Sequence, residues 1–183
     1  VGFLLMLLEL AVARSAWIRS PELRIWNWGG WAILGGFVGL AARLTVPEWI
    51  SILVGNGLIQ IGMAIYARAI YRFVAQSEPP RWITGFTVLA LIALALMLPW
   101  PLNQRTSVLS FLFIVPLVPC AWLIYRHAWH AERSLRSIAF TFSLCIVALL
   151  VRGVHAWLSP QEYTNLLQAS FGQGGTFLMA FVA

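Results

Sequence analysis

The chain has 183 residues, of which 61% are hydrophobic and only 10% are charged. Soluble domains carry about 25% charged residues, so this composition excludes an ordinary soluble protein and predicts an integral membrane protein. The net charge of +6 depends on arginine alone, because the sequence contains no lysine. The arginines flank apolar runs and form no polar basic face, which argues against nucleic acid and favours anionic membrane lipids as partners.

The arginines follow an alternating pattern along the chain. Nine of the twelve lie in three clusters that separate long apolar runs, and three occupy the intervening positions singly. Basic loops resist translocation across the membrane, so we expect the clusters in the cytoplasm and the single arginines on the outside. The clusters are Arg14, Arg19 and Arg24, then Arg68, Arg72 and Arg81, then Arg126, Arg133 and Arg136, and the single arginines are Arg43, Arg105 and Arg152.

Seven apolar runs are candidates for membrane helices. A helix needs about 20 residues to cross about 30 Å of hydrocarbon. The pattern predicts an all-α bundle of seven transmembrane helices, with the N-terminus outside and the C-terminus in the cytoplasm. We expect one input domain over 1–183 that belongs to a longer protein. The predicted spans are 1–13, 26–44, 49–73, 82–100, 106–125, 137–158 and 163–183.

The second and third predicted spans contain several glycines, and the fifth contains two prolines. Glycines in the second and third spans favour close backbone approach between membrane helices. Pro116 and Pro119 lie inside the fifth span, where each removes a backbone donor and predicts a kink. Cys120 and Cys145 lie inside apolar runs and are interpreted as buried thiols. The glycines are Gly35, Gly36 and Gly39 in the second span and Gly55, Gly57 and Gly62 in the third.

Polar side chains from several predicted helices gather in the outer half of the bundle. An ionisable group inside a bilayer costs several kcal/mol unless it is paired or lines a cavity. We therefore predict a pocket for a small anionic or lipid-like ligand. The alternative is an interhelical hydrogen-bond network that only fixes packing, with about 0.6 kcal/mol per bond. The candidate residues are Asn56, Gln60, Arg43, Arg105, Arg152 and His155.

Two further polar residues, Glu9 and Gln173, lie within the first and last predicted spans. We expect Glu9 to pair with an arginine of another helix; the alternative is a protonated or cavity-lining Glu9 with a sensing or proton-linked role. His127 and His130 precede His155 by almost a full span, so about a bilayer thickness separates them, and we predict no metal site and no cofactor. No nucleophile elbow and no phosphate-binding glycine loop is present, and we assign no catalytic residue.

Three stretches carry a family resemblance: 23–30 (LRIWNWGG), 46–57 (VPEWISILVGNG) and 62–73 (GMAIYARAIYRF). They are similar to the N-terminal membrane sensor region of bacterial diguanylate cyclases that carry a GGDEF domain. In that family a proline, an acidic residue and a tryptophan open a helix that carries Gly-Asn and closes with Arg-Phe. The corresponding residues here are Pro47, Glu48, Trp49, Gly55, Asn56, Arg72 and Phe73.

The resemblance implies a homodimeric sensory input domain in the bacterial inner membrane. Cyclic di-GMP synthesis would belong to a GGDEF domain after the last span, because these residues contain no GGDEF motif and are themselves not an enzyme. The same sensor type also precedes histidine kinase or chemoreceptor outputs. Two other functions stay open, namely a small transporter or permease subunit and a passive dimerising anchor.

Overall fold

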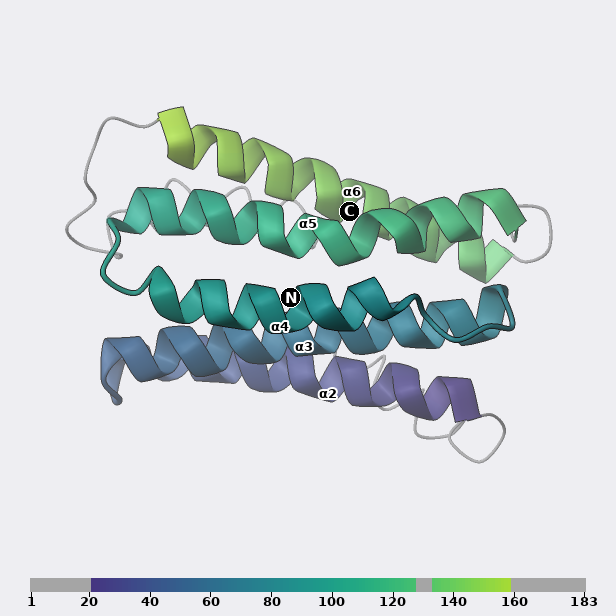
Figure 1. Ribbon diagram of the computed structural model, residues 1–183, viewed down its shortest axis with the longest axis horizontal. Helices are drawn as coiled ribbons and strands as arrows, with labels where there is room; N and C mark the ends of the chain where they lie inside the picture. Colours follow the sequence, from purple (N-terminus) through teal and green to yellow (C-terminus); the bar gives the residue numbers. More distant parts are fainter. Residues whose placement is uncertain (1–20, 128–132, 159–183) are drawn as a thin grey trace.

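The computed structural model describes residues 21–127 and 133–158, and in them it contains five α-helices and one short 3-10 helix (Figure 1). The predicted all-α class is confirmed. The predicted runs at 1–13 and 163–183, with Glu9 and Gln173, lie outside the described residues. The elements are α2 (Pro21–Ala41), η1 (Ala42–Leu44), α3 (Glu48–Val74), α4 (Arg81–Leu96), α5 (Leu102–His127) and α6 (Arg133–Leu158).

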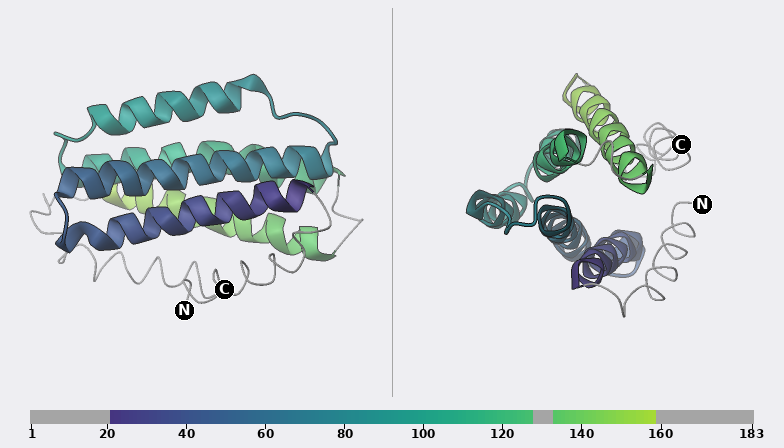
Figure 2. Two further views of the ribbon diagram at one scale, coloured as in Figure 1. Left: turned by 90° about the horizontal axis from the view of Figure 1, so that it is seen from below. Right: turned by 90° about the vertical axis from the view of Figure 1, so that its right-hand side faces the viewer.

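The helices lie side by side and alternate in direction along the chain, so α3 and α5 run parallel to each other (Figure 1). Seen end-on in Figure 2, α3 lies between α2 and α4, and α6 packs on α5. One end, here called the Arg-rich end, holds the start of α2, the 75–80 connection and the end of α5. The opposite end, the Arg-poor end, holds η1, the 97–101 connection and the end of α6. The alternating arginine pattern therefore corresponds to two distinct ends of the bundle.

The prediction of seven transmembrane helices is wrong. Among the described residues, three helices are long and apolar enough to cross a membrane: Glu48–Val74, Leu102–His127 and Leu135–Leu158. The predicted run 26–44 became α2 and η1, whose glycines and tryptophans, with Asn27, lower the hydropathy. The predicted run 82–100 became α4, which ends at Leu96. Its 16 residues cover only about 24 Å at about 1.5 Å each, short of the hydrocarbon thickness.

Glycines bring α2 and α3 into direct backbone contact, as predicted. A Cβ added to Gly36 would lie 2.6 Å from the carbonyl oxygen of Gly55, and one added to Gly62 would lie 2.8 Å from that of Gly29. No larger residue fits at either position without moving a backbone. The Ser51 hydroxyl adds a polar bond to the same interface by donating to the Gly39 carbonyl at 2.6 Å. The two helices therefore form one tightly packed pair.

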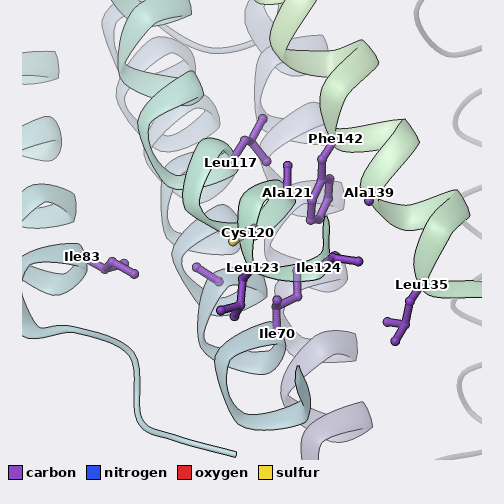
Figure 3. Packing of buried hydrophobic residues seen from close by; sticks show 11 residues of the cluster. Ile70, Ile83, Leu117, Cys120, Ala121, Leu123, Ile124, Leu135, Ala139 and Phe142 are labelled. Carbon is purple, nitrogen blue, oxygen red and sulfur yellow. The ribbon is translucent and has the colours of Figure 1, made fainter. Parts of the chain in front are cut away.

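Two apolar clusters hold the remaining helices together. Near the Arg-rich end, α5 packs against α3, α4 and α6 around Leu117, Cys120 and Ile124 (Figure 3). Near the Arg-poor end, Ile52 and Phe113 belong to a second cluster. The predicted burial is confirmed for Cys120, whereas Cys145 is only half-buried.

The prolines of α5 leave the helix continuous from Leu102 to His127. Pro116 has no N–H, so the Leu112 carbonyl lacks its usual partner within the helix. The Pro116 carbonyl accepts a hydrogen bond from the Cys120 thiol at 3.1 Å. The predicted kink stays a prediction.

Candidate functional site

A short reversal of the chain builds the polar site at the Arg-poor end. After α2, the 3-10 turn η1 is closed by the Thr45 hydroxyl, which donates to the Ala42 carbonyl at 2.9 Å. Pro47 then takes the cap position of α3 with an extended backbone (φ −51°, ψ 134°), and Glu48 is the first helical residue. A proline directly before a helix suits this role because it has no N–H that needs a partner. The reversal places Glu48 beside Arg43.

Two arginines meet on one carboxylate oxygen. Oε1 of Glu48 lies 3.5 Å from Nη2 of Arg43 and 3.6 Å from Nη2 of Arg105. Nη1 of Arg105 also donates to the Leu98 carbonyl at 3.3 Å. These three charged residues, here called the Glu48 cluster, connect η1, α3 and α5. Their formal charges leave the cluster with one net positive charge.

The members of the Glu48 cluster differ in exposure. The Arg105 side chain is 9% exposed, the Glu48 side chain is 58% exposed, and the Arg43 side chain lies between them at 24%. Desolvation by burial lowers the pKa of Arg43 most; the Glu48 carboxylate raises it and the nearby Arg105 lowers it. Among the described residues, Nε of Arg43 is buried without a hydrogen-bond partner. Water therefore reaches the anion of the cluster more easily than its cations.

The two predicted polar residues of α3 lie deeper and apart from the Glu48 cluster. Asn56 is half-buried, and its amide donates to the Ile52 carbonyl one turn back at 2.9 Å. Gln60 is 3% exposed, and both of its amide atoms are buried without a partner among the described residues. Gln60 follows Glu48 by twelve residues, or about 18 Å of helix. Asn56 and Gln60 therefore lie apart from the Glu48 cluster, and the predicted pocket stays a prediction.

The predicted pair on α6, Arg152 and His155, lies towards the Arg-poor end of that helix. Arg152 is half-buried and His155 is exposed. Between them, Gly153 accepts a hydrogen bond from the buried Ser107 of α5 at 2.8 Å. A Cβ added to Gly153 would lie 3.2 Å from Cβ of Ser110, so α6 is held close to α5 at this level. Of the six predicted site residues, the Glu48 cluster contains Arg43 and Arg105.

Glu48 is the site residue that the sequence reasoning missed. The sequence assigned it to a helix start and to the family pattern, not to the pocket. The sequence did contain a signal for Glu48. This residue follows Arg43 by five residues at the end of an apolar run, so an ion pair between the two could have been predicted. Its second partner, Arg105, becomes visible only when α3 and α5 are known to start at the same end.

The Arg-rich end contains a different ion-pair group in the connection between α3 and α4. Glu78 bonds to Arg72, and its Oε2 lies 3.5 Å from Nη2 of Arg68. The hydrogen bond from Arg72 is the main cause that lowers the pKa of this fully exposed carboxyl. Gln76, with a left-handed φ of 51°, turns the chain between the partners. This group links the last turns of α3 to the connection that follows it.

The residues that the structure describes contain no group of three or more His, Cys, Asp or Glu side chains that could hold a metal ion. His127 lies at the Arg-rich end, with Nδ1 3.3 Å from the Leu123 carbonyl oxygen. His130 lies outside the described residues. The histidines of α5 and α6 are thus at opposite ends of the bundle, as predicted.

No protein-family model, curated protein or solved structure matches this chain. The resemblance to GGDEF-associated sensor regions therefore stays a prediction. The fold and composition indicate a helical membrane protein, and residues 21–127 and 133–158 contain three helices able to cross a membrane by length and apolarity. Its distinguishing polar feature is the Glu48 cluster.

Proposed function

We propose that this chain is the membrane-embedded sensory input domain of a bacterial signalling protein in the cytoplasmic membrane. The output that the resemblance suggests is a diguanylate cyclase, and the chain itself has no catalytic role in this proposal. The observation that carries the proposal is the Glu48 cluster, in which arginines from η1 and α5 share the carboxylate at the start of α3.

The position of the Glu48 cluster supports a signalling role. Arg105 sits at the start of α5 and Glu48 at the start of α3, and both helices run from there to the Arg-rich end. A ligand that alters the ion pairs favours one arrangement of these helix starts over another. Such differential binding shifts the population of a two-state bundle. Parallel α3 and α5 would transmit that shift to the opposite end.

The arginine distribution supports the orientation that a sensor requires. The ends of α3, α4, α5 and α6 that meet at the Arg-rich end carry the second and third arginine clusters. By the positive-inside rule this end faces the cytoplasm. The Glu48 cluster would then face the periplasm or outer leaflet, where a small anionic or lipid-like ligand arrives. Homodimerisation enters the proposal from the resemblance alone.

A transporter fits the described residues less well. A passage needs polar groups along the whole bundle, whereas the apolar cluster around Leu117 and Ile124 fills the space between α5 and its neighbours near the Arg-rich end. A passive anchor does not require an ion-pair group that joins the starts of α3 and α5. The experiment below separates the anchor from the sensor.

The test is a cellular one on the full gene product. Arg105→Gln and Arg43→Gln should each change the cellular cyclic di-GMP level at least threefold at equal membrane abundance. Arg136→Gln, at an exposed position of the Arg-rich end, is the matched control and should leave the level unchanged. A chimera with an unrelated transmembrane bundle should lose regulation. Full regulation by the chimera, or wild-type levels in both cluster variants, would contradict the sensor.

A further inference from the structure

The contacts of Glu48 with its two arginines are longer than ideal charge-assisted hydrogen bonds. Charge-assisted hydrogen bonds between guanidinium and carboxylate are about 2.7–2.9 Å long, whereas its two contacts are 3.5 and 3.6 Å. A single oxygen serves both arginines, so neither pair is bidentate. Glu48 neutralises part of the positive charge without making the strongest contacts that two arginines offer.

The two arginine side chains are more deeply buried than the carboxylate that they share. Arg105 is buried and is held by the Leu98 carbonyl as well as by Glu48. Arg43 carries a buried Nε without a partner among the described residues. Glu48 is mostly exposed, so its carboxylate reaches water by side-chain rotation at little desolvation cost. Its departure would leave the positive charges of Arg43 and Arg105 without the carboxylate that they share.

The surroundings of Glu48 are apolar and exposed. Val46 and Trp49, on either side of the Pro47–Glu48 pair, are 37% and 55% exposed. Tryptophan favours the boundary between membrane and water, where its ring contacts acyl chains and headgroups. An incoming anion with an apolar tail therefore has apolar side chains beside the charged group.

We propose that Arg43 and Arg105 form a binding site for an exogenous carboxylate, and that Glu48 occupies the ligand's place when the site is free. The ligand's carboxylate takes the position between the two guanidinium groups, and the Glu48 side chain swings into water. A carboxylate is the group the site already accepts, so the exchange preserves its charge and planar geometry. This inference rests on the proposed function for its signalling consequence, while binding is measured independently.

The experiment measures binding to the full chain in phosphatidylcholine nanodiscs at pH 7. The probes are dodecanoate and acetate, each labelled with ¹³C at the carboxyl carbon and followed by NMR, with inorganic phosphate as a competitor. Glu48→Gln removes the internal competitor and should lower the dissociation constant about tenfold relative to wild type. Arg105→Gln and Arg43→Gln should each raise it at least tenfold, and Arg136→Gln should leave it unchanged.

The outcomes separate the sources of the carboxylate. Binding of dodecanoate alone identifies a membrane-derived acyl carboxylate, and equal binding of both probes identifies a water-soluble one. Displacement of labelled acetate by phosphate at a lower concentration than by unlabelled acetate overturns the carboxylate assignment. Equal dissociation constants for Glu48→Gln and wild type overturn the displacement. Undiminished binding in Arg105→Gln, or no binding in wild type and Glu48→Gln, overturns the site.

Circular dichroism and gel filtration identify variants that do not fold. The tighter binding by Glu48→Gln tests the proposal even where Arg105→Gln is unstable. Carboxylate binding with the predicted variant pattern but no change in cyclic di-GMP would refute the sensory function and leave the site intact. A changed cyclic di-GMP level in the variants without carboxylate binding would refute the binding site and leave the sensory function intact.

Discussion

Arg105 and Gln60 are both buried polar side chains, but they differ in whether they have a hydrogen-bond partner. The Arg105 side chain is buried, donates to the Leu98 carbonyl and lies beside the exposed carboxylate of Glu48. The Gln60 amide is equally buried but has no partner among the described residues. An unpaired buried amide costs about 1–3 kcal/mol. Within the described residues, therefore, the buried Arg105 is paired and the buried Gln60 is not.

Replacing Gln60 tests that cost. Gln60→Leu keeps the side-chain size and removes the unpaired amide, so we expect the free energy of unfolding to rise by about 1 kcal/mol. Chemical denaturation in detergent micelles measures it. Asn56→Leu is the control, because the Asn56 amide already has a partner and its replacement should bring no comparable gain. A loss of stability in Gln60→Leu would show that the amide is paired.

At the scale of the elements, the α2–α3 pair depends on glycine more than on apolar bulk. Gly36→Ala and Gly62→Ala would each press a methyl group against a carbonyl oxygen of the partner helix. Overpacking of this kind costs about 1–3 kcal/mol, so we expect a corresponding loss of unfolding free energy. Gly85→Ala in α4 is the matched control, because a Cβ there meets nothing within 4 Å. Equal stability of all three variants would contradict the close contact.

The connection between α3 and α4 should respond to pH through Glu78. Its pKa is lowered in the folded protein, so its stabilising contribution is complete above the ordinary carboxyl value, about 4.3. The contribution is lost as the pH falls through the lower, folded value. Wild type should therefore melt at a higher temperature than Glu78→Gln at pH 6, and the difference should disappear in stronger acid. A difference in melting temperature that persists in stronger acid would exclude the carboxylate as its cause.

For the whole molecule, the apolar runs predicted the described helices well, because prolines before α3, α4 and α5 mark their starts. The predicted number of membrane-spanning helices was wrong because a segment can form a helix without being long and apolar enough to cross a membrane. α2 is helical although Asn27 and its glycines make it less apolar, and α4 is apolar but ends at Leu96.

The candidate site was predicted only in part. Arg43 and Arg105 stood out as single arginines outside the clusters, and the structure joins them. Gln60 and Asn56 share a face of α3 but lie further along the helix than Glu48. The decisive partner, Glu48, required knowledge of which helix starts are neighbours. Local periodicity carries no such long-range information.

Orientation is the central claim, because a cluster on the cytoplasmic side could not receive an external ligand. Single cysteines at exposed positions, Val46→Cys at the Arg-poor end and Gln76→Cys at the Arg-rich end, report it through a membrane-impermeant maleimide applied to spheroplasts. The unaltered chain, with Cys120 buried and Cys145 half-buried, gives the background. We predict labelling of Val46→Cys in intact spheroplasts and of Gln76→Cys only after lysis. The reverse pattern would contradict the account.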